Sequence, residues 1–321
     1  MAIVNQLKLA ALQTTFDTLA AQAFGTDKTN RYGIFSRTAK CDGQSFSPTA
    51  MGSTPAVREI VGSRRWASLR GFANSVPVKR WGPDGIELPI LQINNDPGGL
   101  LEQNLKQYLD TVTNFYEKPA TDFLLTNPTS LYGGALLSDT QSFGYNGNTW
   151  DNLGAALSPT EFFTGIKLMN GLWLENGEPA GVYPDVLMVG PDNQKMASDL
   201  VSSDRVVPIA ATGLEAYSSA VAVSTRSNFA ADGQQPTIRY VVNPRFNANG
   251  ATASGAAWFF FDTRQEARRP IVVGEAIAPS GQIVIDPSAP AMIDRSAAQA
   301  YVEGQAGIAG AIPFATYGYI A

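Results

Sequence analysis

NPRFNANGATASGAAWFFFDTRQEARRPIV, residues 243–272, is the stretch of this chain that decides its fold. It contains an aromatic run, Ala257 to Phe261, and a second apolar run that begins at Pro270 and reaches Val273. Aromatic and β-branched residues are enriched in strands, and turn-forming residues separate the two runs. The stretch therefore predicts two strands joined by an irregular segment.

The residues before this stretch predict more strands, together with helices. Apolar runs at Val182 to Val189, Arg205 to Ala210 and Thr237 to Val242 are typical of strands. Two helices are predicted by their start signals: one begins at Ser158-Pro159-Thr160-Glu161 and places Phe162, Ile166, Met169 and Trp173 on one face, and the other opens at Pro191 to Lys195 and runs through Leu200. Strands and helices do not alternate regularly, so the sequence predicts an α+β class rather than a doubly wound parallel sheet.

The amino-terminal segment predicts two helices joined by an extended or loop connection. Leu9, Leu12, Phe16, Leu19 and Ala23 recur at spacings of three and four, which is the stripe of an amphipathic helix, and Gly25 ends it. The connection covers residues 26–53, and the second, short helix covers residues 54–69.

A hairpin and a long helix are predicted next. VPVKRWGPDGIELPILQIN, residues 76–94, places two β-prone runs around Gly82-Pro83-Asp84-Gly85, which predicts a long projecting hairpin. Asp96-Pro97 then starts a helix of about five turns that Pro119 kinks or ends. Its apolar positions are Leu101, Leu105, Tyr108, Val112 and Phe115.

Composition excludes several classes of function. The 321 residues contain no histidine and a single cysteine, Cys41, so neither a His-dependent catalytic relay nor an internal disulfide framework can form. The net charge of -5 argues against a dedicated nucleic-acid binder, whose surface would be basic. Gly304, Gly307 and Gly310 imitate a dinucleotide fingerprint by spacing, but no strand followed by a helix frames them, so close backbone packing explains them better. We therefore expect no catalytic, metal or cofactor-binding residues.

Membrane insertion is not expected either. The opening MAIVNQLKLAALQTTF lacks the pattern of a secretion signal, and the uncharged run from Gly304 to Ala321 is Gly-rich and contains Pro313. That run is interpreted as a buried strand and turn.

An ordered series of motifs runs along the chain. The series comprises LYGGALLSDTQSF, LSPTEFFTGIKLM, YPDVLMVGPDNQKMASDLVSS, the Asn-Pro-Arg step at Asn243 to Arg245, the aromatic strand that ends in a backbone-turning Asp262, and the Arg-Pro-Ile step at Arg269 to Ile271. In this order the motifs resemble one family, the Mu-like major head subunit of tailed phages. The match spans most of the chain from about Pro55 onward. No single motif is strong, and the order carries the weight.

The resemblance implies the Hong Kong 97-type capsid fold. Carried onto this sequence, it implies an N-terminal arm at 1–53, a short helix of the peripheral domain at 54–71, an extended hairpin loop at 72–96, the peripheral domain with its spine helix at 97–183, an axial domain at 184–265, and a return to the peripheral domain at 266–321. The implied function is that of a major capsid protein, which is a structural role and not an enzymatic one.

The resemblance also implies partners and a location. Copies of the chain would assemble as hexamers and pentamers into an icosahedral shell that encloses double-stranded DNA without sequence specificity. A portal and a decoration protein are implied, and the scaffolding protein is expected to be separate because the chain lacks a long charged N-terminal extension. The protein would be assembled in the host cytoplasm and located in the virion, away from membranes.

Residues of the arm and the hairpin are predicted to contact neighbouring subunits. We expect a monomer to expose the arm's Leu and Phe face together with Trp81, Ile90 and Leu91, because a projecting hairpin cannot bury them against its own core. The predicted contact residues are Leu12, Phe16, Lys79, Arg80, Trp81 and Glu87. Two alternatives stay open: an encapsulin-like bacterial compartment of the same fold, and a soluble α+β enzyme or binding protein.

Overall fold

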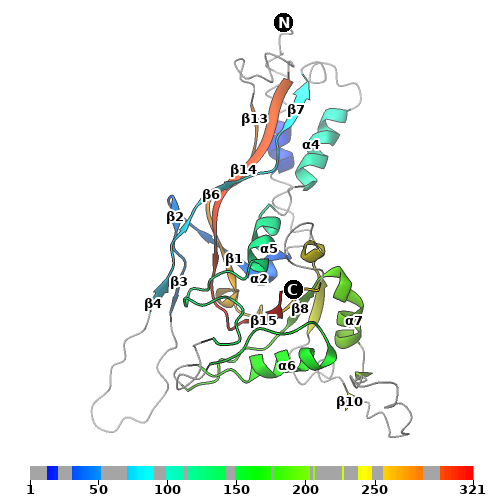
Figure 1. Cartoon of the computed structure of the whole chain (residues 1–321). Coiled ribbons are helices and arrows are strands. Elements are labelled where there is room, and N and C mark those ends of the chain that lie inside the picture. The colour runs from blue at the N-terminus through cyan, green and yellow to red at the C-terminus, as the bar shows by residue number, and fades with distance from the viewer. Residues whose placement is uncertain are drawn as a thin grey trace.

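The computed structural model describes residues 13–20, 31–51, 71–89, 99–111, 115–141, 149–174, 177–202, 205–206, 226–227, 238–247, 256–284 and 297–320, and structural statements refer to these residues. The molecule is elongated (Figure 1): a tall ribbon of strands rises from a broader base. Helix α4 (Leu100–Thr111) lies beside the ribbon, whereas α6 (Pro159–Asn170) and α7 (Gln194–Ser202) lie in the base.

The ribbon is part of a five-stranded sheet. The strand order is β1, β13, β14 and β6, with β7 also pairing with β14. The bounds are β1 Ser36–Lys40, β6 Lys79–Trp81, β7 Ile86–Pro89, β13 Ile271–Val284 and β14 Ala297–Gly310. Strands β13 and β14 have 14 residues each and pair antiparallel, while β1 runs parallel to β13. A strand of that length extends about 45 Å, which accounts for the height of the ribbon.

Burial along β14 shows how the ribbon is covered. Between Gln299 and Gln305 buried and more accessible residues alternate, as in a strand with one covered face. That face packs against α4 (Leu100–Thr111) and the helical residues 13–20, so that Phe16 and Leu105 are fully buried. From Ala306 to Ala311 every residue is buried, because both faces of the sheet are covered where the ribbon enters the base.

The second sheet forms the centre of the base. Its order is β11, β8, β12 and β15, with bounds β8 Val186–Val189, β11 Arg239–Val242, β12 Trp258–Phe261 and β15 Thr316–Tyr319. Every residue of β8 and β12 is buried, and alternate residues enter two different core clusters. Trp258 and Phe260 face one cluster, and Phe259 and Phe261 face the other. A strand buried on both faces needs a continuous apolar run, which explains AWFFF.

Helices α6 and α7 pack on one face of this sheet, and α5 (Glu117–Leu125) packs on the other. Helix α6 (Pro159–Asn170) starts as predicted: the Ser158 hydroxyl accepts the Glu161 N–H at 3.1 Å, and Pro159 follows at the first helical position. The strands predicted at Val182 to Val189 and Ala257 to Phe261 are confirmed as β8 and β12, although β8 begins only at Val186. The helix predicted from Pro191 through Leu200 is confirmed as η2 (Pro191–Asn193) followed by α7 (Gln194–Ser202). Trp173 lies beyond α6 and is 51% exposed, so its predicted place on the buried helical face is wrong.

The remaining elements are short. They are α2 Tyr32–Phe35, β2 Ser45–Phe46, β3 Thr49–Met51, β4 Gly71–Ala73, β5 Val76–Pro77, α5 Glu117–Leu125, η2 Pro191–Asn193, β9 Arg205–Val206, β10 Arg226–Ser227, η4 Pro244–Asn247 and η5 Glu266–Arg268.

The predicted hairpin around Gly82 to Gly85 is wrong. Strands β6 and β7 do not pair with each other; both pair antiparallel with β14, so they continue one another along its edge. The glycines serve close approach rather than a turn, because a Cβ on Gly82 would lie 2.6 Å from the Val302 carbonyl oxygen. Pairing with a strand more than 200 residues away buries the inner face of this segment, which a free hairpin would leave in water.

A different segment forms a two-stranded ladder. Ser45 lies opposite Pro77 in the β2–β5 pair, and Met51 lies opposite Gly71 in the β3–β4 pair, so both pairs share one register. We call residues 45–51 and 71–77 the hairpin ladder. It leaves the sheet on the left of Figure 1, well away from the ribbon tip. It crosses the predicted boundaries of the arm (1–53) and the extended loop (72–96), and the predicted helix at 54–69 lies outside the described residues.

The predicted single spine helix is also divided. Helix α4 ends at Thr111, and α5 begins at Glu117. Pro119 lies in the first turn of α5, where its missing N–H has no helical partner to lose, so it does not end a helix.

The chain finally returns to the second sheet. Strand β15 pairs antiparallel with β12, so residues 316–319 form an edge of the second sheet. The interpretation of Gly304, Gly307 and Gly310 as close-packing residues is confirmed, since a Cβ at each would lie within 3.1 Å of a neighbouring atom.

Candidate functional site

The outer edge of the first sheet carries the predicted contact residues of β6 and β7. Lys79, Arg80 and Glu87 are exposed there, as predicted. The Arg80 guanidinium forms two hydrogen bonds with the Glu303 carboxylate of β14, so its charge has a partner within the same chain. Trp81 points the other way, where its indole N–H donates to the Ala306 carbonyl at 2.9 Å.

The expectation that a monomer exposes the arm and Trp81 is wrong for the residues that can be checked. Phe16 is 0% exposed and its ring packs against Gly281, while Trp81 is half-buried against the core of the base. The ribbon supplies an apolar face that both side chains cover. Leu12, Ile90 and Leu91 lie outside the described residues.

The edge formed by β6 and β7 is poorly suited to accept another strand. Pro83 and Pro89 remove backbone N–H donors along it, and Lys79, Arg80 and Glu87 place charges on it. Prolines and charges of this kind blunt sheet edges against pairing with other chains. Contacts made here are therefore expected to involve side chains.

The hairpin ladder is fixed to the sheet by aromatic side chains. Phe46 is 7% exposed and lies over Gly274 of β13 and Gly307 of β14. Phe72 contacts Tyr132 edge-to-face, with ring centroids 4.6 Å apart. Sequence reasoning missed these residues, although isolated glycines within strands are a usable signal of close approach.

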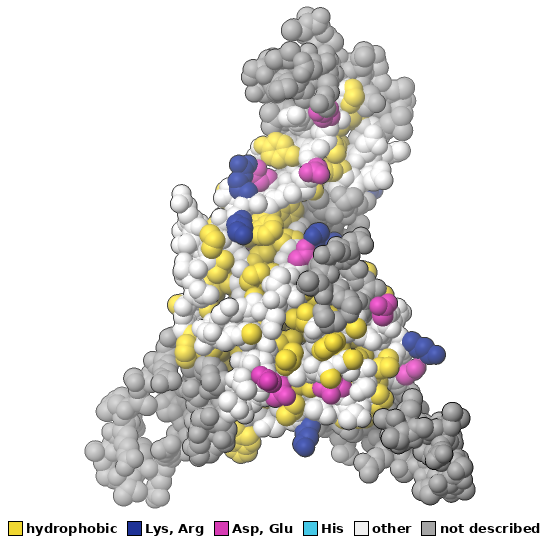
Figure 2. All heavy atoms as spheres, viewed as in Figure 1, with side chains coloured by type: hydrophobic (Ala, Val, Ile, Leu, Met, Phe, Trp, Pro, Cys, Tyr) yellow, Lys and Arg dark blue, Asp and Glu magenta, His cyan; other side chains and the backbone are white. Residues whose placement is uncertain are grey.

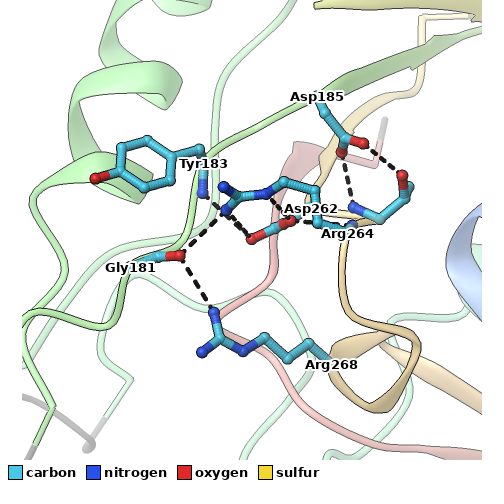
Figure 3. Close-up of polar contacts among 7 residues, drawn as sticks. Gly181, Tyr183, Asp185, Asp262, Arg264 and Arg268 are labelled. Carbon is cyan, nitrogen blue, oxygen red and sulfur yellow. Dashed lines mark hydrogen bonds and ion pairs between the residues drawn. The ribbon is translucent and has the colours of Figure 1, made fainter. Parts of the chain in front are cut away.

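An ion pair between the buried Asp262 and the exposed Arg264 holds the loop before β8 to the loop after β12 (Figure 3). The Asp262 carboxylate accepts the Arg264 Nε–H at 2.8 Å and the Nη2–H at 2.7 Å, and it also accepts the backbone N–H groups of Arg264 and Tyr183. The prediction that Asp262 turns the backbone is confirmed by its bond to the Arg264 N–H. The Gly181 carbonyl accepts from both Arg264 and Arg268, and Asp185 accepts the N–H and hydroxyl of Thr263.

The electrostatics of this pair follow from its contacts. Burial opposes ionisation of Asp262, but the hydrogen bonds from Arg264 and Tyr183 outweigh it and hold the pKa of the carboxyl below its usual value. The guanidinium of Arg264 also lies 4.8 Å from the centre of the Tyr183 ring, a cation–π distance. The arrangement supports a fixed junction between the two loops.

A second ionic junction joins three segments at Glu117. Its side chain is 4% exposed, and its Oε1 lies 3.6 Å from Arg31 and 3.7 Å from Arg245. Arg245 belongs to the Asn-Pro-Arg step, where the buried Asn243 side chain accepts the Arg245 N–H at 3.0 Å. Helix α5, the residue before α2 and the 3-10 helix η4 are thereby held together.

Within the described ranges, no group of three or more His, Cys, Asp or Glu side chains could hold a metal ion. In the same ranges, no helix combines the length and hydropathy needed to cross a membrane. On the coloured part of the face seen in Figure 2, charged side chains are sparse; some lie next to a side chain of opposite charge, and apolar and uncharged side chains cover the area between them.

Comparisons with known proteins give a fold. No family model matches the sequence, and no curated protein matches it. A chain from the capsid structure of the cyanophage P-SCSP1u is similar at 10% identity and a TM-score of 0.52, over 92% of this chain and 88% of that chain. A chain from the mature capsid of bacteriophage PhiM1 gives 12% identity, a TM-score of 0.52 and the same coverage of 92% and 88%.

A third similar chain comes from the virus-like particle of Pyrococcus furiosus, at 9% identity and a TM-score of 0.50, over 95% of this chain and 98% of that chain. The match extends over nearly the whole of each chain, so this chain has the Hong Kong 97-type fold and the predicted α+β class is confirmed.

Proposed function

We propose that this protein is a structural major capsid protein, whose copies assemble into a closed icosahedral shell around phage double-stranded DNA. The observation that carries the proposal is the full-length similarity to capsid chains, which leaves no large part of this chain or of theirs unmatched.

Physical features of the chain support the same role. Its charged content of 16% is low for a protein that stays monomeric, and the viewed surface has few charges. Each copy has an elongated ribbon, and its hairpin ladder leaves the sheet on another side. The sides of one copy therefore present different surfaces. Contacts between unlike surfaces of identical copies are heterologous, and they close into rings or shells when the rotation permits.

The finer assignments are part of the proposal. We infer membership of the Mu-like head subunit family, assembly through hexamers and pentamers, a separate scaffolding protein, a portal and possible decoration partners, with assembly in the host cytoplasm. The net charge of -5 fits a container that encloses DNA without gripping a particular sequence. The five-stranded sheet with α4 and α5 is proposed as the peripheral domain, and the second sheet with α6 and α7 as the axial domain.

The proposed contact surfaces are the hairpin ladder and the charged edge of β6 and β7. Lys79 and Glu87 are exposed on that edge and remain the proposed contact residues. Phe16 and Trp81 instead stabilise the subunit itself, because both are covered by its own strands.

An encapsulin-like compartment that encloses protein cargo is the second candidate, since the similarity to the Pyrococcus furiosus particle is of the same order. The contents of the particle separate the two. Nuclease-protected double-stranded DNA inside particles from infected or induced cells supports the capsid, whereas a single protein cargo without DNA supports the compartment.

The first test is negative-stain electron microscopy of the purified chain, with sedimentation velocity over a range of concentrations. Closed shells, or rings of five and six copies, support the proposal. A homogeneous 34.2 kDa monomer at every concentration, both alone and with the proposed scaffolding protein present, contradicts it.

A further inference from the structure

Two glycines form a notch in the first sheet. Gly274 of β13 and Gly307 of β14 are direct cross-strand partners. Glycine in a strand interior gives up side-chain packing and conformational entropy, so two glycines opposite each other are costly unless something needs the space.

The ring of Phe46 occupies that space. A Cβ on Gly274 would lie 2.1 Å from Phe46 Cγ, 2.3 Å from Cδ2 and 2.5 Å from Cδ1. A Cβ on Gly307 would lie 3.1 Å from Phe46 Cβ and 3.4 Å from the Pro77 carbonyl oxygen. A side chain at either position would therefore displace the strand pair that carries Phe46 and Pro77.

The notch lies at the root of the hairpin ladder. Phe46 pairs with Val76 across β2 and β5, and the chain leaves the ladder through a backbone bond from Val78 N–H to the Gln44 carbonyl at 2.9 Å. The ring is buried in a cluster with Cys41, Leu131, Val272, Ala309 and Ala311. The root of the ladder is thus held to the sheet at one defined position.

A second attachment lies further along the ladder. Phe72 of β4 contacts Tyr132, and Tyr132 contacts Phe314 with ring centroids 6.3 Å apart. Two separated attachments fix the direction of the ladder, whereas one would leave it free to pivot.

We propose that Phe46 and the Gly274–Gly307 notch are a positioning device that sets the direction in which the hairpin ladder leaves the sheet. The direction determines which surface of a neighbouring copy the ladder meets, a step that rests on the proposed function. In an ordinary core, aliphatic side chains of the two strands themselves fill the space above them. Here both strands have glycine at this position, and the Phe46 ring fills the space instead. A ring over a cross-strand glycine also compensates for the lost packing.

The test uses Gly274→Ala and two readouts. Spin labels at exposed positions 73 and 299, in a Cys41→Ser background, report the distance between the ladder and the ribbon in dissociated subunits. We expect Gly274→Ala to shift this distance and to raise the subunit concentration needed for assembly about tenfold, which corresponds to about 1.4 kcal/mol. An unchanged distance with normal assembly overturns the proposal.

Gly165→Ala is the matched control. Its Cβ would lie 2.6 Å from the Tyr317 ring, a comparable clash within the base and away from the ladder. We expect it to lower the midpoint of thermal unfolding while leaving the label distance and the assembly threshold of folded subunits unchanged. If the control showed an equal assembly defect, the notch would contribute only ordinary packing, and the proposal that it sets the direction of the hairpin ladder would be refuted.

Two further variants keep the test independent of folding defects. Phe46→Ala leaves the notch empty, so the label distance is expected to broaden. Gly274→Ala combined with Phe46→Ala removes the clashing ring, so the double variant is expected to assemble at a lower concentration than Gly274→Ala alone. If the double variant needs the same concentration as Gly274→Ala, the proposed role of the notch is contradicted. If wild-type subunits never assemble, the proposed function fails, while the label distances still decide the role of the notch.

Discussion

Replacing Asp262 by Asn is expected to loosen the junction in Figure 3 in a pH-dependent way. The substitution keeps the shape of the side chain but removes the charge that accepts two guanidinium hydrogen bonds, at 2.8 and 2.7 Å. Hydrogen bonds to charged groups contribute about 1.5–3 kcal/mol each. The Arg264 side chain is 40% exposed and regains water when the bond is lost, so we expect a total loss of about 2–3 kcal/mol in the free energy of unfolding.

The pH dependence follows from the lowered pKa of Asp262. Because the folded-state pKa lies below the usual value of 3.8, the charged carboxylate contributes its full stability above about pH 4, and this contribution is lost as the pH falls through the folded-state pKa. The difference between wild type and Asp262→Asn should therefore be constant from pH 5 to 7 and shrink below about pH 4.

The assay is denaturant unfolding of dissociated subunits, followed by intrinsic fluorescence, at several pH values. Arg264→Gln and the double variant complete a double-mutant cycle. The coupling energy between positions 262 and 264 should account for most of the loss in the free energy of unfolding. A loss below about 0.5 kcal/mol, or a coupling near zero, would refute the view that this pair holds the two loops together.

Three other changes test separate features. Asn152→Ala removes a fully buried amide that donates to the carbonyls of Leu136, Pro313 and Thr316, so the unfolding free energy should fall by about 2–4 kcal/mol, and a loss under 1 kcal/mol in denaturant unfolding would show that water replaces it. Ser158→Ala removes the cap of α6 and should cost about 1 kcal/mol in the same assay, whereas Ser158→Asp should restore stability. Trp81→Phe keeps most of the apolar contact but loses the bond to Ala306, so a fall of about 1 kcal/mol with unchanged assembly is expected, and an assembly defect in fully folded Trp81→Phe subunits would instead support a contact role for this residue.

Elements with local signals were predicted well. The start of α6 depends on Ser158 and Pro159, which act within one helical turn, and β12 depends on an aromatic run that needs cover on both faces. The ordered series of motifs around them was sufficient to predict the fold that the capsid structures share.

Elements whose partners lie far along the chain were predicted poorly. Residues 79–89 have the composition of a hairpin, yet their hydrogen-bonding partner is β14, so turn chemistry gave the wrong pairing. The division between α4 and α5 was missed because the apolar spacing of three and four continues across it.

In the candidate site, too, features that depend on residue type were predicted, and features that depend on distant partners were not. Exposure of Lys79, Arg80 and Glu87 follows from their charge, but the partner of Arg80 is Glu303 of another strand. Phe16 and Trp81 were predicted to be exposed because the sequence does not reveal the apolar face that the ribbon offers them.

By itself, the sequence determined the α+β class, the caps and buried strands, and the absence of histidine chemistry, because each depends on residue type or on spacing within a few turns. The capsid-type fold was indicated by the resemblance of the ordered motifs to one family. Only the tertiary structure decided that β6 and β7 extend along β14, that residues 45–51 and 71–77 form the ladder, and that the Phe46 ring fills the gap between two glycines. The physical reason is that strand pairing and close packing are set by which surfaces meet across long sequence separations, and a one-dimensional pattern does not specify those partners.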